Sequence, residues 1–292
     1  EDAIPDLPSV GPGVNLSEGV PDNGRASKAA AHAMLSRIYL NKAVYSAADP
    51  AGPYTFEKAD MDKVVEHANA VEDEGYSLDA DYFNIFTGNS SEIIWASQAG
   101  TPQNRWFMTL HYNQNPSGWN GFATMADFYA KFGEDDIRRG NGGPGTPGYQ
   151  FDEADFGSNY SALGKGFLIG QQYNDDGGKI VDTRSNRDLE FTTDVPLAGA
   201  ATEKGIRVLK YHPADAGKYI LIRYGEVLLN KAEAIMRGGT STESAVDIVN
   251  SLRVLRGVDP LASIDDTTML DERGRELYWE GLRRMDQIRF GT

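Results

Sequence analysis

The sequence predicts a mainly α-helical protein, a tetratricopeptide-like scaffold of helical hairpins with long loop-rich insertions and a few short strands. Two observations predict this class. Apolar side chains recur every three or four residues over 25–75 and again over 219–291, which is the period of amphipathic helices. Residues 88–202 are instead rich in Gly, Asn and Pro and show no sustained period. We therefore expect a single domain over residues 1–292, in which a loop-rich insertion interrupts a helical scaffold.

The C-terminal region carries three successive helix patterns. The first, over 219–239, has an apolar stripe of Leu221, Tyr224, Leu228, Ala232 and Ile235 and leaves Arg223, Glu226, Lys231 and Glu233 outside it. The second opens at Thr240, which has capping-box spacing to Glu243, and stops at Gly257. So short a connection predicts an antiparallel hairpin of these two helices. The third covers 269–291, where Leu277, Gly281, Met285 and Ile288 form the buried stripe and charged pairs predict a solvated face.

The N-terminal region predicts a second hairpin. Residues 1–24 indicate a loop, because Pro, Gly, Asp and Asn follow one another without an apolar period. A helix over 26–45 has a face of small side chains, which permits close packing against the next helix. That next helix, over 56–75, has the stripe Met61, Val64, Val65, Ala68 and Val71. His32 lies in the first helix, where a partly buried structural role is favoured over metal binding or catalysis.

The middle of the chain has a different character. Residues 93–96 form a short apolar run that is typical of a strand, with Trp95 expected in the core. Residues 140–202 hold many glycines, which predicts long ordered loops and no second hydrophobic domain. Residues 174–178 offer oxygen ligands for calcium but lack the twelve-residue loop pattern, so a turn is favoured.

Aromatic and amide side chains gather in one Gly- and Asn-rich stretch between residues 105 and 132. Sugars present C–H faces ringed by hydroxyls, so a site for them needs flat aromatic rings together with amide groups. The predicted glycan-binding residues are Trp106, Tyr112, Asn113, Asn115, Trp119 and Asn120. The alternative is that rings such as Trp119 and Phe122 pack the loop onto the helices.

Composition excludes several classes of function. The formal charge of -15 disfavours nucleic acid and simple docking on anionic lipid. The absence of cysteine excludes disulfides, thiolate metal sites and a cysteine nucleophile. Adjacent carboxylates such as Asp135 and Asp136 do not fix the spacing that glycoside hydrolysis requires, and no nucleophile elbow, phosphate loop or zinc-ligand helix is present. We therefore expect no enzyme, no cofactor and no metal.

Three sequence blocks resemble a known family. They are GRASKAAAHAMLSRIYL at 24–40, RYGEVLLNKAEA at 223–234 and ERGRELYWEGLRRMDQIRFG at 272–291. All three are similar to ordered blocks of the SusD/RagB family, the glycan-binding lipoproteins on the cell surface of Bacteroidetes. Gly274 departs from the family pattern, in which an Arg or a similar helix former is commoner, and a mid-helix Gly costs about 1 kcal/mol relative to Ala.

The resemblance implies a non-catalytic protein that captures a polysaccharide or oligosaccharide and delivers it to a SusC-like TonB-dependent outer-membrane transporter. The insertion would face the ligand, and the protein would sit on the cell-surface side of the outer membrane. Family members are longer and carry a lipidated N-terminal Cys that this sequence lacks, so we expect a chain cut at both ends. The acidic composition slightly favours a neutral glucan over an anionic polymer. The alternative function is a helical-repeat scaffold that binds only protein partners through exposed apolar helix faces.

Overall fold

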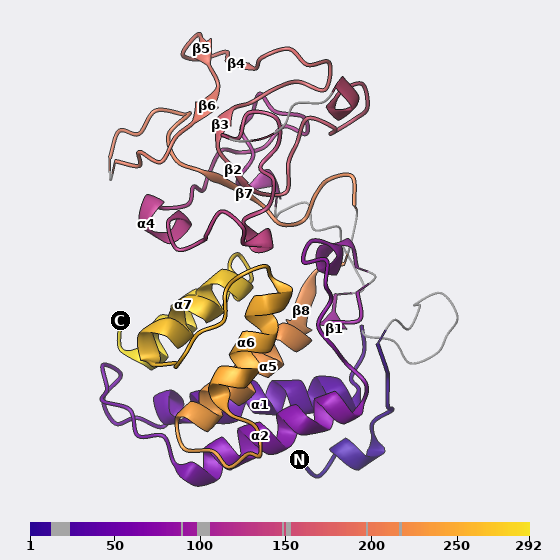
Figure 1. Cartoon of the computed structure of the whole chain (residues 1–292), viewed down its shortest axis with the longest axis vertical. Coiled ribbons are helices and arrows are strands. Elements are labelled where there is room, and N and C mark those ends of the chain that lie inside the picture. Colours follow the sequence, from indigo (N-terminus) through magenta and orange to yellow (C-terminus); the bar gives the residue numbers. More distant parts are fainter. Residues whose placement is uncertain are drawn as a thin grey trace. The chain divides into compact units, whose positions relative to one another are not determined.

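The chain divides into two compact units. A computed structural model describes residues 1–12, 24–88, 90–97, 106–147, 149, 153–196, 198–215 and 218–292. The helical unit consists of Glu1–Gln98 with Tyr219–Thr292, and the insertion unit consists of Ala99–Lys218 (Figure 1). Helices dominate and the strands are few and short, which confirms the predicted class. That the two units form one domain stays a prediction.

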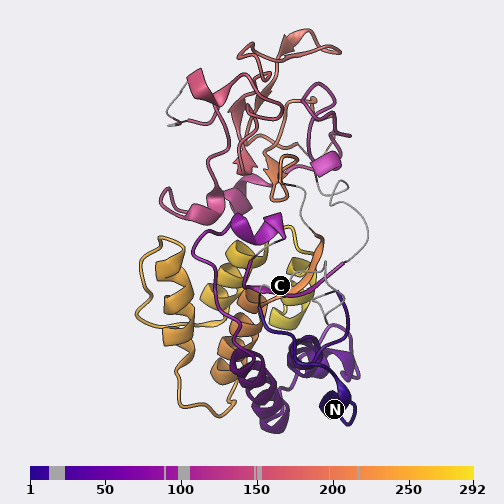
Figure 2. The same cartoon turned by 90° about the vertical axis from the view of Figure 1, so that its right-hand side faces the viewer.

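The helical unit contains both predicted hairpins. Its elements are the 3-10 helices η1 (Ile4–Asp6) and η3 (Asn84–Thr87), the helices α1 (Lys28–Tyr45), α2 (Lys58–Asp73), α5 (Tyr224–Met236), α6 (Ala245–Leu255), α7 (Asp266–Leu277) and α8 (Arg283–Phe290), and the strands β1 (Ile93–Ala96) and β8 (Ile220–Arg223). Helices α1 and α2 lie side by side, as do α5 and α6 (Figures 1 and 2). The two hairpins also contact each other, because α5 packs on α2.

The first hairpin forms as predicted. Ser27 caps α1 by accepting a hydrogen bond from the amide N–H of Ala30 at 3.1 Å. The small residues Ala29 and Ala33 of α1 are buried, which allows close approach to the buried side chains of α2. All five residues of the predicted α2 stripe are buried, namely Met61, Val64, Val65, Ala68 and Val71. Such burial contributes about 1.5–3 kcal/mol for each large apolar side chain.

The helix predicted over 219–239 begins at Tyr224, so its predicted start is wrong. Residues Ile220–Arg223 form strand β8, which pairs antiparallel with the predicted strand β1. Ile220 and Ile222 are buried whereas Leu221 is exposed, and this period of two belongs to a strand. Trp95 of β1 is half-buried and packs against the hydrophobic cluster that contains Ile94, Ile222 and Val227, in keeping with its predicted place in the core.

The second and third C-terminal helices also differ from prediction at their ends. Helix α6 begins after Ser244, whose hydroxyl accepts from the amide N–H of Asp247 at 3.2 Å, so Thr240 is not its cap. The helix predicted over 269–291 is two helices, α7 and α8. Gly281 at φ +80° and Trp279 at φ +61° lie in the break between them. These left-handed conformations interrupt a right-handed helix, and Gly281 is exposed instead of buried.

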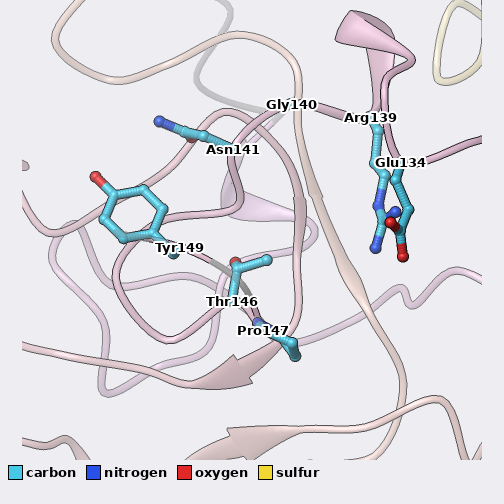
Figure 3. A pocket seen from close by; sticks show the side chains of 7 residues that line it. All are labelled: Glu134, Arg139, Gly140, Asn141, Thr146, Pro147 and Tyr149. Carbon is cyan, nitrogen blue, oxygen red and sulfur yellow. The ribbon is translucent and has the colours of Figure 1, made fainter. Parts of the chain in front are cut away.

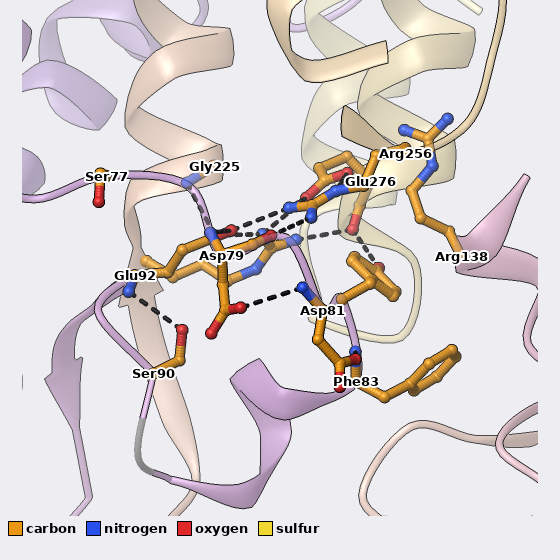
Figure 4. Close-up of polar contacts among 12 residues, drawn as sticks. Ser77, Asp79, Asp81, Phe83, Ser90, Glu92, Arg138, Gly225, Arg256 and Glu276 are labelled. Atoms are coloured by element: carbon orange, nitrogen blue, oxygen red, sulfur yellow. Dashed lines mark hydrogen bonds and ion pairs between the residues drawn. The ribbon is translucent and has the colours of Figure 1, made fainter. Parts of the chain in front are cut away.

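Many charged side chains that were predicted to face solvent are buried. Arg223, Glu226, Lys231, Glu233, Glu272, Arg273 and Glu276 each have side chains almost without exposure. They are buried because partners come from other elements. Arg223 Nη1 donates to Glu92 at 2.9 Å and to Glu276 at 2.8 Å, and Arg256 Nη2 donates to the same two carboxylates at 2.8 and 3.1 Å (Figure 4).

The insertion unit is built from short antiparallel strand pairs. Strand β2 (Gly166–Leu168) pairs with β7 (Arg207–Leu209), β3 (Gly170–Gln171) with β6 (Glu190–Phe191), and β4 (Val181–Asp182) with β5 (Arg187–Asp188), and the short helices are α4 (Ala126–Tyr129), η4 (Ile137–Arg139) and η5 (Glu153–Asp155). Its core cluster contains Leu110, Leu168, Ile180, Leu189, Phe191 and Leu209. The glycine-rich sequence predicted ordered loops but not this hydrophobic core.

Candidate functional site

The predicted site residues lie on one folded-back segment of the insertion unit. The amide N–H of Trp119 donates to the carbonyl of Phe107 at 2.6 Å, and that of Asn120 donates to the carbonyl of Leu110 at 2.9 Å. Gly118 permits this close approach, since a Cβ there would lie 2.2 Å from the Leu110 carbonyl oxygen. The segment therefore returns on itself between Leu110 and Gly118 and projects Trp119 from the end of the return.

Trp119 is the most exposed of the three predicted aromatic residues. It is 65% exposed, and its ring is inclined by 21° to that of Phe107, with the ring centroids 6.2 Å apart. We call Phe107 and Trp119 together the aromatic platform. Phe122 and Met125, three and six residues further on, are also about half exposed. Several exposed apolar side chains close together on one short segment are typical of a binding surface.

The other two predicted rings are engaged within the protein. Trp106 packs against the core cluster of the unit. The Tyr112 ring lies 3.8 Å from the His111 ring and 4.0 Å from the guanidinium carbon of Arg184, and its hydroxyl donates to Asp182 at 2.6 Å. Tyr112 therefore contributes more to holding the segment than to an open surface.

The three predicted asparagines brace the same segment. Asn113 exchanges hydrogen bonds of 3.2 to 3.3 Å with Thr183. The amide nitrogen of Asn115 donates to Asn159 at 2.8 Å and to Asp175 at 2.7 Å. Asn120 donates to the carbonyl of Thr202 and accepts from Arg207, as described next. That these amides bond a ligand hydroxyl stays a prediction.

Two buried charges that sequence reasoning missed support the segment. All five N–H groups of Arg207 are used, at 2.6 to 3.0 Å, by the Asn120 side chain and by the carbonyls of Thr202, Lys204 and Gly205. Burial lowers the pKa of Arg207 to about 10, so it remains a cation at neutral pH. No motif marks such a residue, because its partners are mostly backbone carbonyls.

Asp182 is the second of these charges. Its carboxylate accepts hydrogen bonds from the hydroxyls of Tyr112, Ser185 and Thr202 and from the amide N–H of Arg184. Burial alone would raise the pKa of Asp182, but these hydrogen bonds outweigh it and hold that pKa well below its usual range. Burial also lowers the pKa of the adjacent His111 to about 4, so this ring is neutral at neutral pH.

A polar pocket of about 620 Å³ lies in the same unit (Figure 3). Its lining residues are Glu134, Arg139, Gly140, Asn141, Thr146, Pro147 and Tyr149. A carboxylate, a guanidinium, an amide, a hydroxyl and a phenol thus surround one hollow. Arg139 is fixed there by Tyr129, whose hydroxyl accepts from Nε at 2.8 Å. No sequence pattern predicted this pocket, since its residues lie on irregular loops.

Within the described ranges, no three His, Cys, Asp or Glu side chains are grouped as a metal ion would require. Nor does any helix in these ranges have the length and apolar character needed to cross a membrane. Residues 174–178 form a turn, as predicted, in which the Gly177 amide N–H donates to the Asn174 carbonyl at 2.9 Å.

Comparison with known proteins gives consistent matches. The profile of the SusD family matches residues 91–292. SusD-like protein P38 of Formosa agariphila is 35% identical over 111 residues, which cover 32% of this chain and 22% of that protein. The crystal structure of a SusD-like protein from Bacteroides fragilis superposes with a TM-score of 0.63 at 22% identity, covering 98% of this chain and 57% of the other.

Another solved structure, with a xylogluco-oligosaccharide, has a TM-score of 0.64 at 16% identity and covers 99% of this chain and 54% of the other. The chain therefore spans little more than half the length of these solved relatives. The fold agrees with theirs, and the predicted resemblance to the SusD/RagB family is confirmed. Because the family profile matches residues 91–292, well over half of the sequence, this chain belongs to the SusD family.

Proposed function

We propose that this chain is part of a non-catalytic protein that captures a polysaccharide or oligosaccharide at the cell surface. The observation that carries the proposal is the exposed ring of Trp119, stacked on Phe107. A flat ring can cover the C–H face of a sugar, and contact with one such ring contributes about 1–3 kcal/mol. The oligosaccharide in one of the solved relatives supports the same ligand class.

The platform suits weak, repeated binding along a polymer. Phe107 lies behind Trp119, and the bonds of Asn120 to Arg207 fix the backbone next to it, so little ordering entropy is lost on binding. The polar pocket of the same unit is a second candidate contact for glycan hydroxyl groups, since Asn141 and Thr146 offer an amide and a hydroxyl there. A Kd from micromolar to millimolar is expected from so few contacts.

Delivery and location follow from family membership as proposals. A captured glycan serves uptake only if a partner moves it across the membrane, and a SusC-like TonB-dependent transporter is the partner proposed. The full-length protein would be lipid-anchored on the cell-surface side of the outer membrane. A neutral glucan is favoured over an anionic polymer because a protein with a net charge of -15 repels uronates and sulfates.

The capture step is tested by calorimetry with xyloglucan, other neutral glucans and anionic glycans. Trp119→Ala should weaken binding by about 5-fold to 150-fold, which is 1–3 kcal/mol, without lowering the melting temperature. Trp106→Ala is the matched comparison, because this ring packs on the core cluster and its loss should lower stability. Calorimetry of Asn141→Ala separately measures how much the polar pocket contributes to the binding affinity. Absence of binding across the panel, or full binding by Trp119→Ala, would reject the platform.

The delivery step is tested in native membranes. Mild detergent extraction should recover the protein with a large β-barrel partner, and prolonged incubation with the bound glycan should release no reducing sugar. Recovery as a lone monomer would favour a free-standing adhesin. Cleavage of the glycan that one carboxylate substitution abolishes would favour an enzyme.

A further inference from the structure

A second hollow, of about 520 Å³, lies in the helical unit and has a different chemistry. It is lined by the end of α2, by one face of α5 and by the first turns of α6. Leu228 and Ile248 give it apolar walls, and the carboxylates of Glu72, Glu243 and Asp247 stand along it. No aromatic surface like that of Trp119 is open among these lining residues, so the hollow does not repeat the proposed glycan platform.

Among the described residues, the hollow has three carboxylates along it but only one lysine, Lys231, beside them. Lys231 lies one turn beyond Leu228 on α5, is buried, and bonds to both Glu72, at 3.3 Å, and Glu243. Asp247 accepts a hydrogen bond of 2.6 Å from the Ser244 hydroxyl but has no cationic partner. Glu72 and Glu243 remain about half exposed, so a second cation can reach them from solvent. The excess of carboxylates disfavours an anionic ligand.

An unpartnered hydroxyl faces the same space. The Tyr224 residue lines the hollow and is only 6% exposed, and its hydroxyl makes no hydrogen bond within the described ranges. The hydroxyl oxygen itself keeps access to solvent, because it is not one of the fully buried polar atoms without a partner, so a ligand in the hollow can donate a hydrogen bond to it. Tyr224 lines the hollow together with Glu72 and Glu243. Burial first, and then the charges of these two carboxylates, raise the pKa of Tyr224, so its hydroxyl stays protonated at neutral pH.

We propose that this hollow binds an alkylammonium group. The ammonium would pair with Glu72, Glu243 or Asp247 and donate to the Tyr224 hydroxyl oxygen, while the aliphatic stem would contact Leu228 and Ile248. The group could belong to a free amine or to a lysine side chain of a partner protein, since both offer the same chemistry. The site is independent of the glycan platform, which lies in the other unit.

The test is a titration of the whole chain with n-butylammonium chloride, followed by amide chemical shifts at constant ionic strength. Shifts should concentrate on the Tyr224–Lys231 face of α5 and the start of α6, with a millimolar Kd, and 1-butanol should not reproduce them. Tyr224→Phe removes only the hydroxyl and should weaken binding 3-fold to 10-fold with unchanged melting temperature. Glu72→Gln should also weaken it. Glu66→Gln, which alters an exposed carboxylate of α2 outside the hollow, is the control.

Equal effects of Tyr224→Phe and Glu66→Gln, or shifts spread over the acidic surface, would overturn the proposal in favour of general charge attraction. No shift up to tens of millimolar would also overturn it. A blocked lysine dipeptide and a lysine-containing peptide separate the two sources. Tighter binding of the peptide identifies a partner's side chain, and tighter binding of the free amine identifies a small molecule. Neither outcome depends on whether Trp119 binds glycan.

Discussion

The Arg207 guanidinium holds the backbone next to the aromatic platform through hydrogen bonds. It lies buried among neutral acceptors, and two of its five hydrogen bonds end on Asn120, directly after Trp119. Its other bonds hold the carbonyls of the turn at 202–205. Arg207 is therefore a positioning residue, which acts on Trp119 through the backbone.

Arg207→Met should destabilise the protein by about 2–4 kcal/mol, because it leaves the Asn120 oxygen and several carbonyls buried without donors. Urea denaturation measures the loss, and glycan affinity should fall in the same variant even where it is folded. Arg187→Gln is the control, since Arg187 is mostly exposed and its pair with Glu203 should be worth less than about 1 kcal/mol. Equal stability of the two variants would show that Arg207 does not hold the segment.

The residue types of the site segment were predictive only in part. Aromatic and amide side chains in a loop predicted a glycan site, with packing of Trp119 onto the helices as the alternative. Trp119 is exposed, and its binding of glycan stays a prediction. The partners of the asparagines were invisible, because Asp175, Thr183 and Arg207 lie 60, 70 and 87 positions from Asn115, Asn113 and Asn120. A sequence shows which groups can bond, but burial and distant partners decide which of them remain available.

At the scale of elements, one buried ion-pair network joins the strand pair of the helical unit to its helices. Glu92 precedes β1, Arg223 ends β8, Arg256 follows α6 and Glu276 lies in α7. Glu92 also accepts from the Asp79 amide N–H at 2.9 Å (Figure 4). Because charges in such a place are stable only when paired, the network fixes how these elements meet.

Glu92→Gln should reduce the free energy of unfolding by about 3–5 kcal/mol. The amide keeps the shape of the side chain but leaves Arg223 and Arg256 with one carboxylate fewer between them. Glu66→Gln, in an exposed pair with Lys63, should change it by about 0.5 kcal/mol or less. Chemical denaturation of both variants tests the difference, and a loss below about 1 kcal/mol in Glu92→Gln would mean that the network contributes little.

The sequence pattern predicted which segments are helical, but it did not predict where the helices begin and end. Apolar positions every three or four residues identified α1, α2, α5 and α6, since packing on neighbours follows that stripe. The start of α5 was predicted too early, because apolar residues at 220 and 222 are compatible with a strand as well as with a helix. Whether this segment forms a strand depends on its pairing with β1, which is distant in the sequence. The charged positions of α5 and α7 were taken for a solvated face, since the carboxylates and guanidiniums that bury them belong to other elements.

At the scale of the whole molecule, buried carboxylates should make stability depend on pH. Burial works against the charge of Glu233, but Arg289, Arg273 and Arg237 lower its pKa from 4.5 to about 2. Between these values the unfolded state binds the proton more readily, so this contribution is complete above about pH 4.5 and is lost as the pH falls towards 2.

Urea denaturation at pH 7, 4.5 and 3 should therefore show a fall in the free energy of unfolding below pH 4.5. Glu233→Gln should be less stable at pH 7, because it removes one of the two carboxylates that pair with Arg289 and leaves only Asp286, and it should lose less on acidification. Parallel pH dependences of the two proteins would assign the acid sensitivity to other groups.

Cooperativity between the two units tests the predicted single domain. Each unit has its own core clusters, and the chain passes from one unit to the other twice, after Gln98 and after Lys218. If they form one domain, calorimetry should show a single transition, and a change in either unit should shift the whole of it. Arg207→Met in the insertion unit and Glu92→Gln in the helical unit should then both lower that one transition. Two transitions, each lowered by only one of these variants, would establish two independently folding domains and would make the helical unit a scaffold that needs no insertion to fold.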